Sequence, residues 1–466
     1  MIQGTSSWAG KSLIATALCR HFARQGVRVA PFKAQNMSNN ARVVDGGEIG
    51  VAQYLQAIAA RVQPDVRMNP VLVKPEGLTQ SQVVVHGLVD RRISAVPWRE
   101  RAGSLWPVIA ESLRSLLDEY ELVVLEGAGS PAEINLLDCD LTNARAARAA
   151  DAPVLLVCDI DRGGAFAHLY GTWALLDDEQ RERMAGFVLN KFRGDAALLA
   201  PAPERLTELT GVPLLGVVPW LEHGLPDEDG AAAPAAGAEL SSTVAVVRYP
   251  TASNLDEFKL LEQVALVRWA RRAADLDGAE LVILPGSKHV VSDLAWLRAT
   301  GLDRAISARV RAGGRVLGVC GGLQMLGEQL CDEDGGNGAG EGLALLPLRT
   351  TFAPEKLTRH TELRFAANLG DAWAPLAHQE VRGYEIRHGH TEATAPVAEA
   401  LPGGRGWVRG PVLGVSVHGL LEHPALLAAL FGRAPERSLD AALDELADSV
   451  MAGLNRRRID ALAGVA

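Results

Sequence analysis

The first 31 residues constrain the fold more than any other stretch of the chain. Met1-Ile-Gln leads into Gly4-Thr5-Ser-Ser-Trp-Ala-Gly10-Lys11-Ser12, followed by a predicted amphipathic helix at 13–24 and a predicted strand at 27–31. Five residues separate Gly4 from Gly10, one more than in the usual phosphate loop. The order strand, glycine-rich loop, Lys-Ser, helix, strand still indicates a phosphate-binding loop, because backbone N–H groups and the helix dipole attract anions there.

Two side chains of this loop and one distant carboxylate form the predicted nucleotide site. The Lys11 ammonium would neutralise β- and γ-phosphate oxygens, and the Ser12 hydroxyl would bind Mg²⁺. Glu126 directly follows a predicted buried strand at 121–125. A carboxylate at the carboxyl end of a parallel strand suits a second Mg²⁺ ligand, although a helix N-cap or an ordinary loop acid is the alternative. Weaker candidates for the metal are Asp45 and Glu48.

Strands that end in polar residues recur through the N-terminal half. The apolar stretch 153–158 precedes Asp159 and Asp161, and the stretch 185–189 precedes Asn190. Helical patterns lie between the predicted strands. Alternation of this kind predicts an α/β fold with a doubly wound, mostly parallel sheet.

A cysteine between glycines marks the C-terminal half. Cys320 lies in Gly318-Val-Cys-Gly-Gly322, after a predicted strand at 315–319 and before a helical pattern. This is the thiol version of a nucleophile elbow, and a helix N-terminus favours the reactive thiolate. A buried inert cysteine is the alternative, but glycines on both sides favour a reactive one.

A histidine at the end of a strand is the predicted partner of this cysteine. His418 follows the apolar stretch 412–417, and a cysteine nucleophile needs a base. A histidine that only packs or caps is the alternative. Leu420 stands two residues beyond His418, where an acid would be expected, and Glu422 lies on an uncertain face. The third member of the site is therefore left unassigned.

Composition excludes several classes of protein. A net charge of −10 argues against a nucleic-acid partner, and 48% hydrophobic with 22% charged residues is ordinary for a globular protein. No apolar run approaches the roughly 20 residues of a membrane span. Because the phosphate loop begins almost at Met1, we expect no signal peptide. The five cysteines have neither disulfide-framework nor zinc-site spacing, which predicts a reduced, cytoplasmic protein. The oligomeric state is not predicted.

An acidic, Ala/Pro/Gly-rich stretch at 222–242 has no periodicity and indicates an interdomain linker. Beyond it, a new series of strands and helices begins. We predict a phosphate-loop domain at 1–228, a linker at 229–242, a second doubly wound domain at 243–432 and a helical tail at 433–466.

Several motifs together resemble a known family. Gly318-Val-Cys-Gly-Gly-Leu-Gln324 and Ser416-Val-His-Gly419 resemble class I glutamine amidotransferases, which have a flavodoxin-like fold. The N-terminal half resembles the dethiobiotin-synthetase-like phosphate-loop ligases, which share the five-residue loop spacing. The two halves, in this order, resemble the cobyric acid synthase family. The motifs that favour this family are Pro31–Ser38, Met68–Pro75, Glu126–Asn135, Asp159–Gly164 and Asn190–Asp195.

The resemblance implies an ATP- and glutamine-dependent ligase of cobalamin biosynthesis. Such an enzyme amidates four peripheral carboxylates of adenosylcobyrinic acid a,c-diamide and yields adenosylcobyric acid. Each carboxylate would be activated as an acyl phosphate and attacked by ammonia derived from glutamine. The implied small molecules are therefore ATP with Mg²⁺, glutamine and a corrinoid.

The resemblance also implies roles for individual residues. Cys320 would attack glutamine and His418 would move the proton, and family members likewise lack an acid just after this histidine. The residues implied for the oxyanion and for glutamine are Gly286, Gly321 and Gln324. Those implied for ATP are Gly4, Thr5, Gly10, Lys11, Ser12 and, at the adenine, Asn190. Cations that would suit a polyanionic substrate are Lys33, Arg42, Lys74, Arg162 and Arg193.

Three other functions are compatible with parts of the sequence. Cobyrinic acid a,c-diamide synthase has the same order of domains, but the Pro31–Ser38 and Asp159–Gly164 motifs favour the first interpretation. A nucleotide-binding switch with a degenerate amidotransferase domain would not need Cys320 and His418. A DNA-partitioning ATPase is disfavoured because the sequence has no basic patch.

Overall fold

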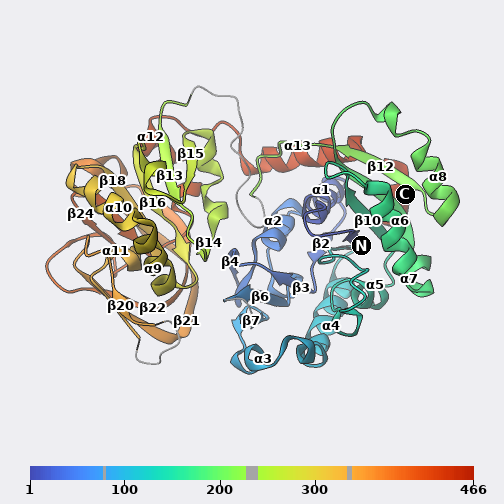
Figure 1. Cartoon of the computed structure of the whole chain (residues 1–466), viewed down its shortest axis with the longest axis horizontal. Helices are drawn as coiled ribbons and strands as arrows, with labels where there is room; N and C mark the ends of the chain where they lie inside the picture. The colour runs from blue at the N-terminus through green and yellow to red at the C-terminus, as the bar shows by residue number, and fades with distance from the viewer. Residues whose placement is uncertain (77–79, 227–239, 333–337, 466) are drawn as a thin grey trace.

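The computed structural model describes residues 1–76, 80–226, 240–332 and 338–465. Two α/β domains lie side by side, and the last helices of the chain run from the second domain back to the first (Figure 1). Both domains are built on mostly parallel sheets. The predicted fold class is therefore confirmed. Of the predicted linker, residues 229–239 lie outside the described residues.

The main sheet of the first domain is parallel throughout. Its strands follow the order β1-β10-β11-β12, and a parallel bridge between Ile2 and Glu126 joins it to the pair β2-β9. The strands are β1 (Ile2–Gly4), β2 (Val29–Phe32), β9 (Leu122–Leu125), β10 (Val154–Asp159), β11 (Met184–Phe192) and β12 (Leu214–Pro219). Because parallel strands end at one edge of the sheet, the loops after β1 and β9 meet there.

Helices cover this sheet. The first begins at Lys11 directly behind the phosphate loop, and its apolar face at Ile14, Leu18 and Phe22 is buried. The helices are α1 (Lys11–Arg24), α2 (Val51–Ala59), α4 (Arg101–Glu119), α5 (Ala144–Ala149), α6 (Ala165–Leu175), α7 (Asp178–Glu182) and α8 (Ala202–Thr210).

A smaller group of elements forms the side of the first domain that faces the second (Figure 1). It consists of the sheet β3-β6-β7-β8, the hairpin β4-β5 and a short helix, and β4 contacts both β21 and β22 of the second domain. The bounds are β3 (Gln35–Met37), β4 (Ala41–Val44), β5 (Gly47–Gly50), β6 (Val71–Pro75), β7 (Ser81–Val85), β8 (Leu88–Val89) and α3 (Arg91–Ala95).

The second domain has a seven-stranded sheet of order β15-β13-β16-β18-β25-β24-β23. The first five strands are parallel, and the last two form an antiparallel edge. The strands are β13 (Thr243–Val247), β15 (Leu266–Ala270), β16 (Leu281–Leu284), β18 (Arg315–Val319), β23 (Ala398–Leu401), β24 (Gly406–Arg409) and β25 (Val412–Val415). The helices are α9 (Val290–Thr300), α10 (Leu302–Arg311), α11 (Gly321–Leu326) and α12 (Pro424–Phe431).

A long antiparallel ribbon extends from this domain along the interface. Its strands β21 and β22 pair over most of their length, with β19 and β20 at the other edge. The bounds are β19 (Gln329–Cys331), β20 (Gly340–Glu341), β21 (Leu348–Arg364), β22 (Glu380–Ala393) and, in a separate small pair, β14 (Ala252–Ser253) with β17 (Gly286–Ser287).

The C-terminal helices α13 (Leu439–Ala452) and α14 (Arg456–Leu462) pack on the first domain. Arg20 on α1 is fully buried and donates to Asp440 Oδ1 at 2.6 Å and to Asp444 Oδ1 at 2.8 Å on α13. The tail thus completes the core of the domain that begins the chain. No helix in the described residues is both long and apolar enough to cross a membrane.

Candidate active sites

The phosphate loop joins β1 to α1 at the edge of the parallel sheet. Gly10 has φ 96°, and a Cβ there would lie 1.9 Å from Asn190 Nδ2, so this position requires glycine. Lys11 Nζ donates to Ser6 O at 2.9 Å and to Gly129 O at 3.0 Å. The backbone N–H of Thr5 donates to Val157 O at 2.9 Å, and Gly4 lies against the Lys11 side chain. The loop therefore places the Lys11 ammonium at the opening where phosphates would bind.

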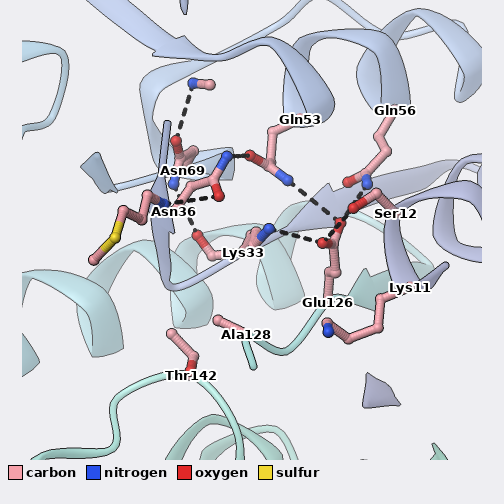
Figure 2. Close-up of polar contacts among 12 residues, drawn as sticks. Lys11, Ser12, Lys33, Asn36, Gln53, Gln56, Asn69, Glu126, Ala128 and Thr142 are labelled. Carbon is pink, nitrogen blue, oxygen red and sulfur yellow. Dashed lines mark hydrogen bonds and ion pairs between the residues drawn. The ribbon is translucent and has the colours of Figure 1, made fainter. Parts of the chain in front are cut away.

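Glu126 is the centre of a buried polar cluster, shown in Figure 2. Its Oε1 accepts hydrogen bonds from Ser12 Oγ and Lys33 Nζ, both at 2.8 Å. Its Oε2 accepts from Gln56 Nε2 at 2.6 Å and from Gln53 Nε2 at 3.4 Å. Two glutamines and a lysine thus hold the carboxylate beside the first turn of α1.

The oxygen atoms of Ser12 and Glu126 are ligands that suit Mg²⁺. A hydroxyl and a carboxylate lie adjacent at the mouth of a phosphate loop, and Mg²⁺ binds one or two such oxygens together with phosphates and waters. The two weaker candidates lie elsewhere. Glu48 pairs with Lys74 at 2.6 Å and also with Lys356, and Asp45 is exposed on the β4–β5 hairpin. Among the described residues, the structure therefore brings only Ser12 and Glu126 of the four candidates together.

Asn190 closes the pocket behind the loop. Its side chain is fully buried, and its Nδ2 donates to Ala9 O at 2.9 Å. Within the described residues its Oδ1 has no hydrogen-bond partner. Lys11, Ser12, Glu126 and Asn190 line one common pocket. A buried acceptor without a partner is costly, so Asn190 Oδ1 is suited to accept from a ligand N–H group.

Cys320 lies at the turn between β18 and α11 with φ 52°. This left-handed conformation is strained for a residue with a Cβ and is typical of a nucleophile elbow. Gly322 allows the turn to approach β16, because a Cβ there would lie 1.9 Å from Leu284 O. The Cys320 Sγ contacts Ile386 O at 3.5 Å. The cysteine is thus presented toward the β22 ribbon.

His418 and Glu257 form a buried pair beside Cys320. His418 Nδ1 lies 3.0 Å from Glu257 Oε1, and Glu257 Oε2 accepts the N–H of Gly419 at 2.9 Å. The exposed fractions of His418 and Glu257 are 1% and 0%. Glu257, on the 3-10 helix η5 (Leu255–Phe258), therefore supplies the third member that the sequence leaves unassigned.

The charges around His418 favour its protonated form. Burial alone would lower its pKa, but the Glu257 carboxylate and the Cys320 sulfur outweigh burial and raise the pKa to about 10. The imidazole therefore holds a proton at neutral pH. That proton is suited to neutralise a thiolate at Cys320 and to be transferred to a leaving nitrogen.

The glycines predicted for the oxyanion lie together. A Cβ on Gly321 would lie 2.6 Å from the backbone nitrogen of Ser287, which follows Gly286. Gly286 in turn lies against the His418 ring. Gln324 lines the same pocket as Cys320, and its Nε2 donates to His388 O at 3.2 Å. The structure thus gathers the predicted glutamine site into one place.

Both halves of the chain match known families. Residues 1–226 match the CobQ/CobB/MinD/ParA nucleotide binding domain, and residues 243–426 match the CobB/CobQ-like glutamine amidotransferase domain. A cobyric acid synthase of Variovorax paradoxus (strain S110) is 58% identical, over 97% of this chain and 96% of the relative. The chain belongs to the cobyric acid synthase family. The family resemblance stated from the motifs is thereby confirmed.

Two further cobyric acid synthases are similarly close. One from Polaromonas sp. (strain JS666 / ATCC BAA-500) is 54% identical, over 97% of this chain and 95% of the relative. One from Acidovorax sp. (strain JS42) is 56% identical, over 99% of this chain and 97% of the relative. Similarity over the full length places both domains and the C-terminal helices within the family.

All five cations predicted for the substrate are paired with carboxylates of the protein. Lys33 binds Glu126, and Lys74 binds Glu48. Arg162 lies 3.5 Å from Asp159, and Arg193 lies 3.4 Å from Asp161. Burial explains the first two pairs, because a buried ammonium needs a counter-charge.

Arg42 of this family member crosses the domain interface. Its Nε donates to Asp256 Oδ2 at 2.9 Å, and its Nη1 donates to Glu422 Oε2 at 2.8 Å. Its guanidinium lies 5.1 Å from the centre of the Tyr384 ring, which stacks on His418 at 5.3 Å. An arginine of the ATP-site domain therefore contacts residues that support the cysteine–histidine site.

We expect Arg42→Met to lower the free energy of unfolding by about 3–5 kcal/mol, because it leaves the buried Asp256 carboxylate and the partly exposed Glu422 carboxylate without their cation. Glutamine-dependent amidation should fall more than ammonium-dependent amidation, because only the former needs an ordered His418. Thermal denaturation and the ratio of the two rates measure these effects. Arg382→Met, at an exposed ion pair with Glu362, is the matched control. An unchanged ratio would show that Arg42 has no influence on the glutamine site.

Proposed function

We propose that this protein is a carbon–nitrogen ligase that amidates four peripheral carboxylates of adenosylcobyrinic acid a,c-diamide, at positions b, d, e and g, to give adenosylcobyric acid. ATP would activate each carboxylate, and glutamine would supply the nitrogen. One observation carries the proposal: a chain of this family holds an intact Cys320–His418–Glu257 site facing a domain with a complete phosphate loop.

In the amidotransferase half, the Cys320 thiolate would attack the side-chain amide carbon of glutamine. The carbon–nitrogen bond breaks as His418 gives its proton to the nitrogen. Ammonia departs, and a γ-glutamyl thioester remains on Cys320. The backbone N–H groups near Gly321 and Gly286 would stabilise the oxyanion. Water then hydrolyses the thioester to glutamate, and His418 takes up a proton. Glu257 keeps the imidazole oriented throughout.

In the ligase half, an oxygen of the substrate carboxylate would attack the γ-phosphorus of ATP. ADP leaves, and the resulting acyl phosphate is then attacked by ammonia, so that a carbon–nitrogen bond forms and phosphate departs. Lys11 would move to the β- and γ-phosphate oxygens, while Ser12 and Glu126 would hold Mg²⁺. Mg²⁺, when bound, supplies positive charge that neutralises the phosphates. Asn190 Oδ1 would accept a hydrogen bond from the adenine amino group.

Mass spectrometry tests this proposal directly. The purified protein is incubated with adenosylcobyrinic acid a,c-diamide, ATP, Mg²⁺ and glutamine, and the corrinoid mass is followed with time. We expect four successive replacements of a carboxyl OH by NH₂. Amidation of only the a and c carboxylates of cobyrinic acid would point instead to the related diamide synthase activity.

All five cysteines are free thiols, which favours a reducing cytoplasm as the location.

A further inference from the structure

A third cavity adjoins the two sites. It is formed by β7, the helix α3 and the 3-10 helix η2 (Trp98–Glu100), and it also includes His388 on β22 of the second domain. The volume of this cavity is about 1630 Å³, against about 1250 Å³ for the pocket at the phosphate loop and about 580 Å³ for the pocket at Cys320. Each volume includes the part that is open to solvent. It is the most spacious of the three.

This cavity shares a wall with each of the other two. Met37 lines both this cavity and the nucleotide pocket. His388 lines both this cavity and the Cys320 pocket. In the described residues the cavity therefore adjoins both the nucleotide pocket and the Cys320 pocket.

The reaction demands a compartment in this position. The accepting carboxylate must touch the γ-phosphate while the acyl phosphate forms, and the same carbon must then receive ammonia from the Cys320 side. We propose that this third cavity binds the corrinoid carboxylate substrate. The inference rests on the proposed function and goes beyond it by assigning the acceptor to named residues.

The lining suits a large amphipathic acid. One part of the wall is apolar and includes Val89, Val96 and Pro97, beside the half-exposed ring of Trp98. The rest carries amide, hydroxyl and guanidinium groups, including Gln82, Ser94, Arg91 and Arg101. A corrinoid has the same division, because an apolar macrocycle carries carboxylates and amides at its rim. Apolar walls with a few polar groups are typical of small-molecule sites.

One of the cations is held rigidly. Arg101 donates from Nη1 to Ser81 Oγ, from Nη2 to Ser94 O and from Nε to Val96 O, each at 2.8 Å, and it lies 5.9 Å from the Trp98 ring centre. Arg91, by contrast, is exposed at the start of α3. Two cations at different places on the same wall can meet carboxylates at different rim positions.

The boundary with the Cys320 pocket suits the passage of ammonia. Lys288 Nζ binds Gln82 Oε1 at 2.9 Å and lies 3.2 Å from Glu76 Oε1, so these three side chains form part of the boundary. Burial, with smaller contributions from Lys288 and Lys356, lowers the pKa of His388 to about 4. The His388 imidazole is therefore neutral at neutral pH and has no extra proton to give to ammonia.

Two matched pairs of variants test the site. Arg91→Glu changes a cation of the cavity wall, and Arg92→Glu makes the same charge change on a neighbour that does not line the cavity. Ala95→Trp fills the cavity from an exposed position, and Leu88→Trp places the same ring on an exposed strand outside it. The readouts are the KM values for the corrinoid, ATP and glutamine, and equilibrium dialysis of the coloured corrinoid.

We expect Arg91→Glu and Ala95→Trp to raise the KM and Kd for the corrinoid at least about tenfold over their controls. The first variant loses a cation that would contact a carboxylate, and the second loses cavity volume. The KM values for ATP and glutamine should stay within about twofold. Equal corrinoid affinity in variants and controls, or a parallel rise in all three KM values, would overturn the site. Failure of the wild-type protein to amidate the corrinoid would instead overturn the proposed function.

Discussion

Replacing Cys320 by serine is expected to abolish glutamine-dependent amidation while leaving ammonium-dependent amidation intact. A serine hydroxyl is not ionised at neutral pH and is a weaker nucleophile than a cysteine sulfur, so it cannot replace Cys320 in the attack on the amide. Loss of a nucleophile typically costs about 10³-fold or more in kcat. The ATP site does not depend on Cys320, so the rate with added ammonium should change by no more than about twofold.

Cys331→Ser is the matched control for this experiment. Cys331 lies on β19 of the same domain, is half-buried and is also a free thiol. The two rates are measured by counting amides on the corrinoid with glutamine or with ammonium chloride as nitrogen source. If Cys320→Ser lost activity with both nitrogen sources, the division into a nitrogen-supplying site and an amide-forming site would be wrong.

The features that could be predicted from the sequence are those encoded by contiguous residues. The phosphate loop and the Cys320 elbow each occupy fewer than a dozen neighbouring positions, where glycine spacing and flanking apolar runs specify the backbone. Alternating strands and helices specify the doubly wound sheets in the same local way. For these features, local geometry and the final fold agree.

Glu257 could not be predicted because its partner is far away in the chain. It lies 161 residues before His418, in a short 3-10 helix that has no distinctive pattern. In the sequence it is one acid in Asn254-Leu-Asp-Glu-Phe258, and no rule connects such an acid to a strand-end histidine. Only the packing of η5 against the 3-10 helix η9 (Leu420–Glu422), which follows His418, brings the two side chains together.

The two glutamines that bind Glu126 were only weakly indicated by the sequence. Gln53 and Gln56 stand three residues apart on a largely apolar helix, so both lie on one face, and buried glutamines require partners. The sequence could therefore have indicated a polar target for this face. It could not identify Glu126, which lies 73 positions after Gln53 and 70 after Gln56.

The β4–β5 hairpin and α2 connect the two sites physically. The hairpin carries Arg42 and Glu48, which bind the second domain, and the chain runs from β5 directly into α2. Gln53 and Gln56 on α2 bind the Glu126 carboxylate beside Ser12. A change in the position of the Glu126 carboxylate would therefore act on a helix that is continuous with the interface. The pairs that join the domains, Arg42–Asp256 and Glu48–Lys356, connect residues far apart in the chain and were not predicted from the sequence.

Replacing Lys11 by alanine is expected to stop amidation with either nitrogen source. Lys11 Nζ already lies at the loop mouth, bound to Ser6 O and Gly129 O, and would contact the β- and γ-phosphates of ATP. Lys11 would stabilise the negative charge that develops on the phosphate oxygens in the transition state. Removing this cation should lower kcat by about 10²–10³-fold. Hydrolysis of glutamine at Cys320 should remain measurable, since the second domain keeps its own core.

Lys259→Ala provides the control, because Lys259 pairs with Glu262 at 2.6 Å in the second domain. The decisive comparison is the rate of ADP release together with amide formation at saturating ammonium. An ammonium-dependent rate equal to that of the wild-type protein would remove Lys11 from the chemistry. A loss confined to the glutamine-dependent reaction would place Lys11 in the coupling between domains instead. Loss of both reactions with glutaminase activity retained would locate the activation of the carboxylate at the phosphate loop and leave Cys320 as the supplier of nitrogen.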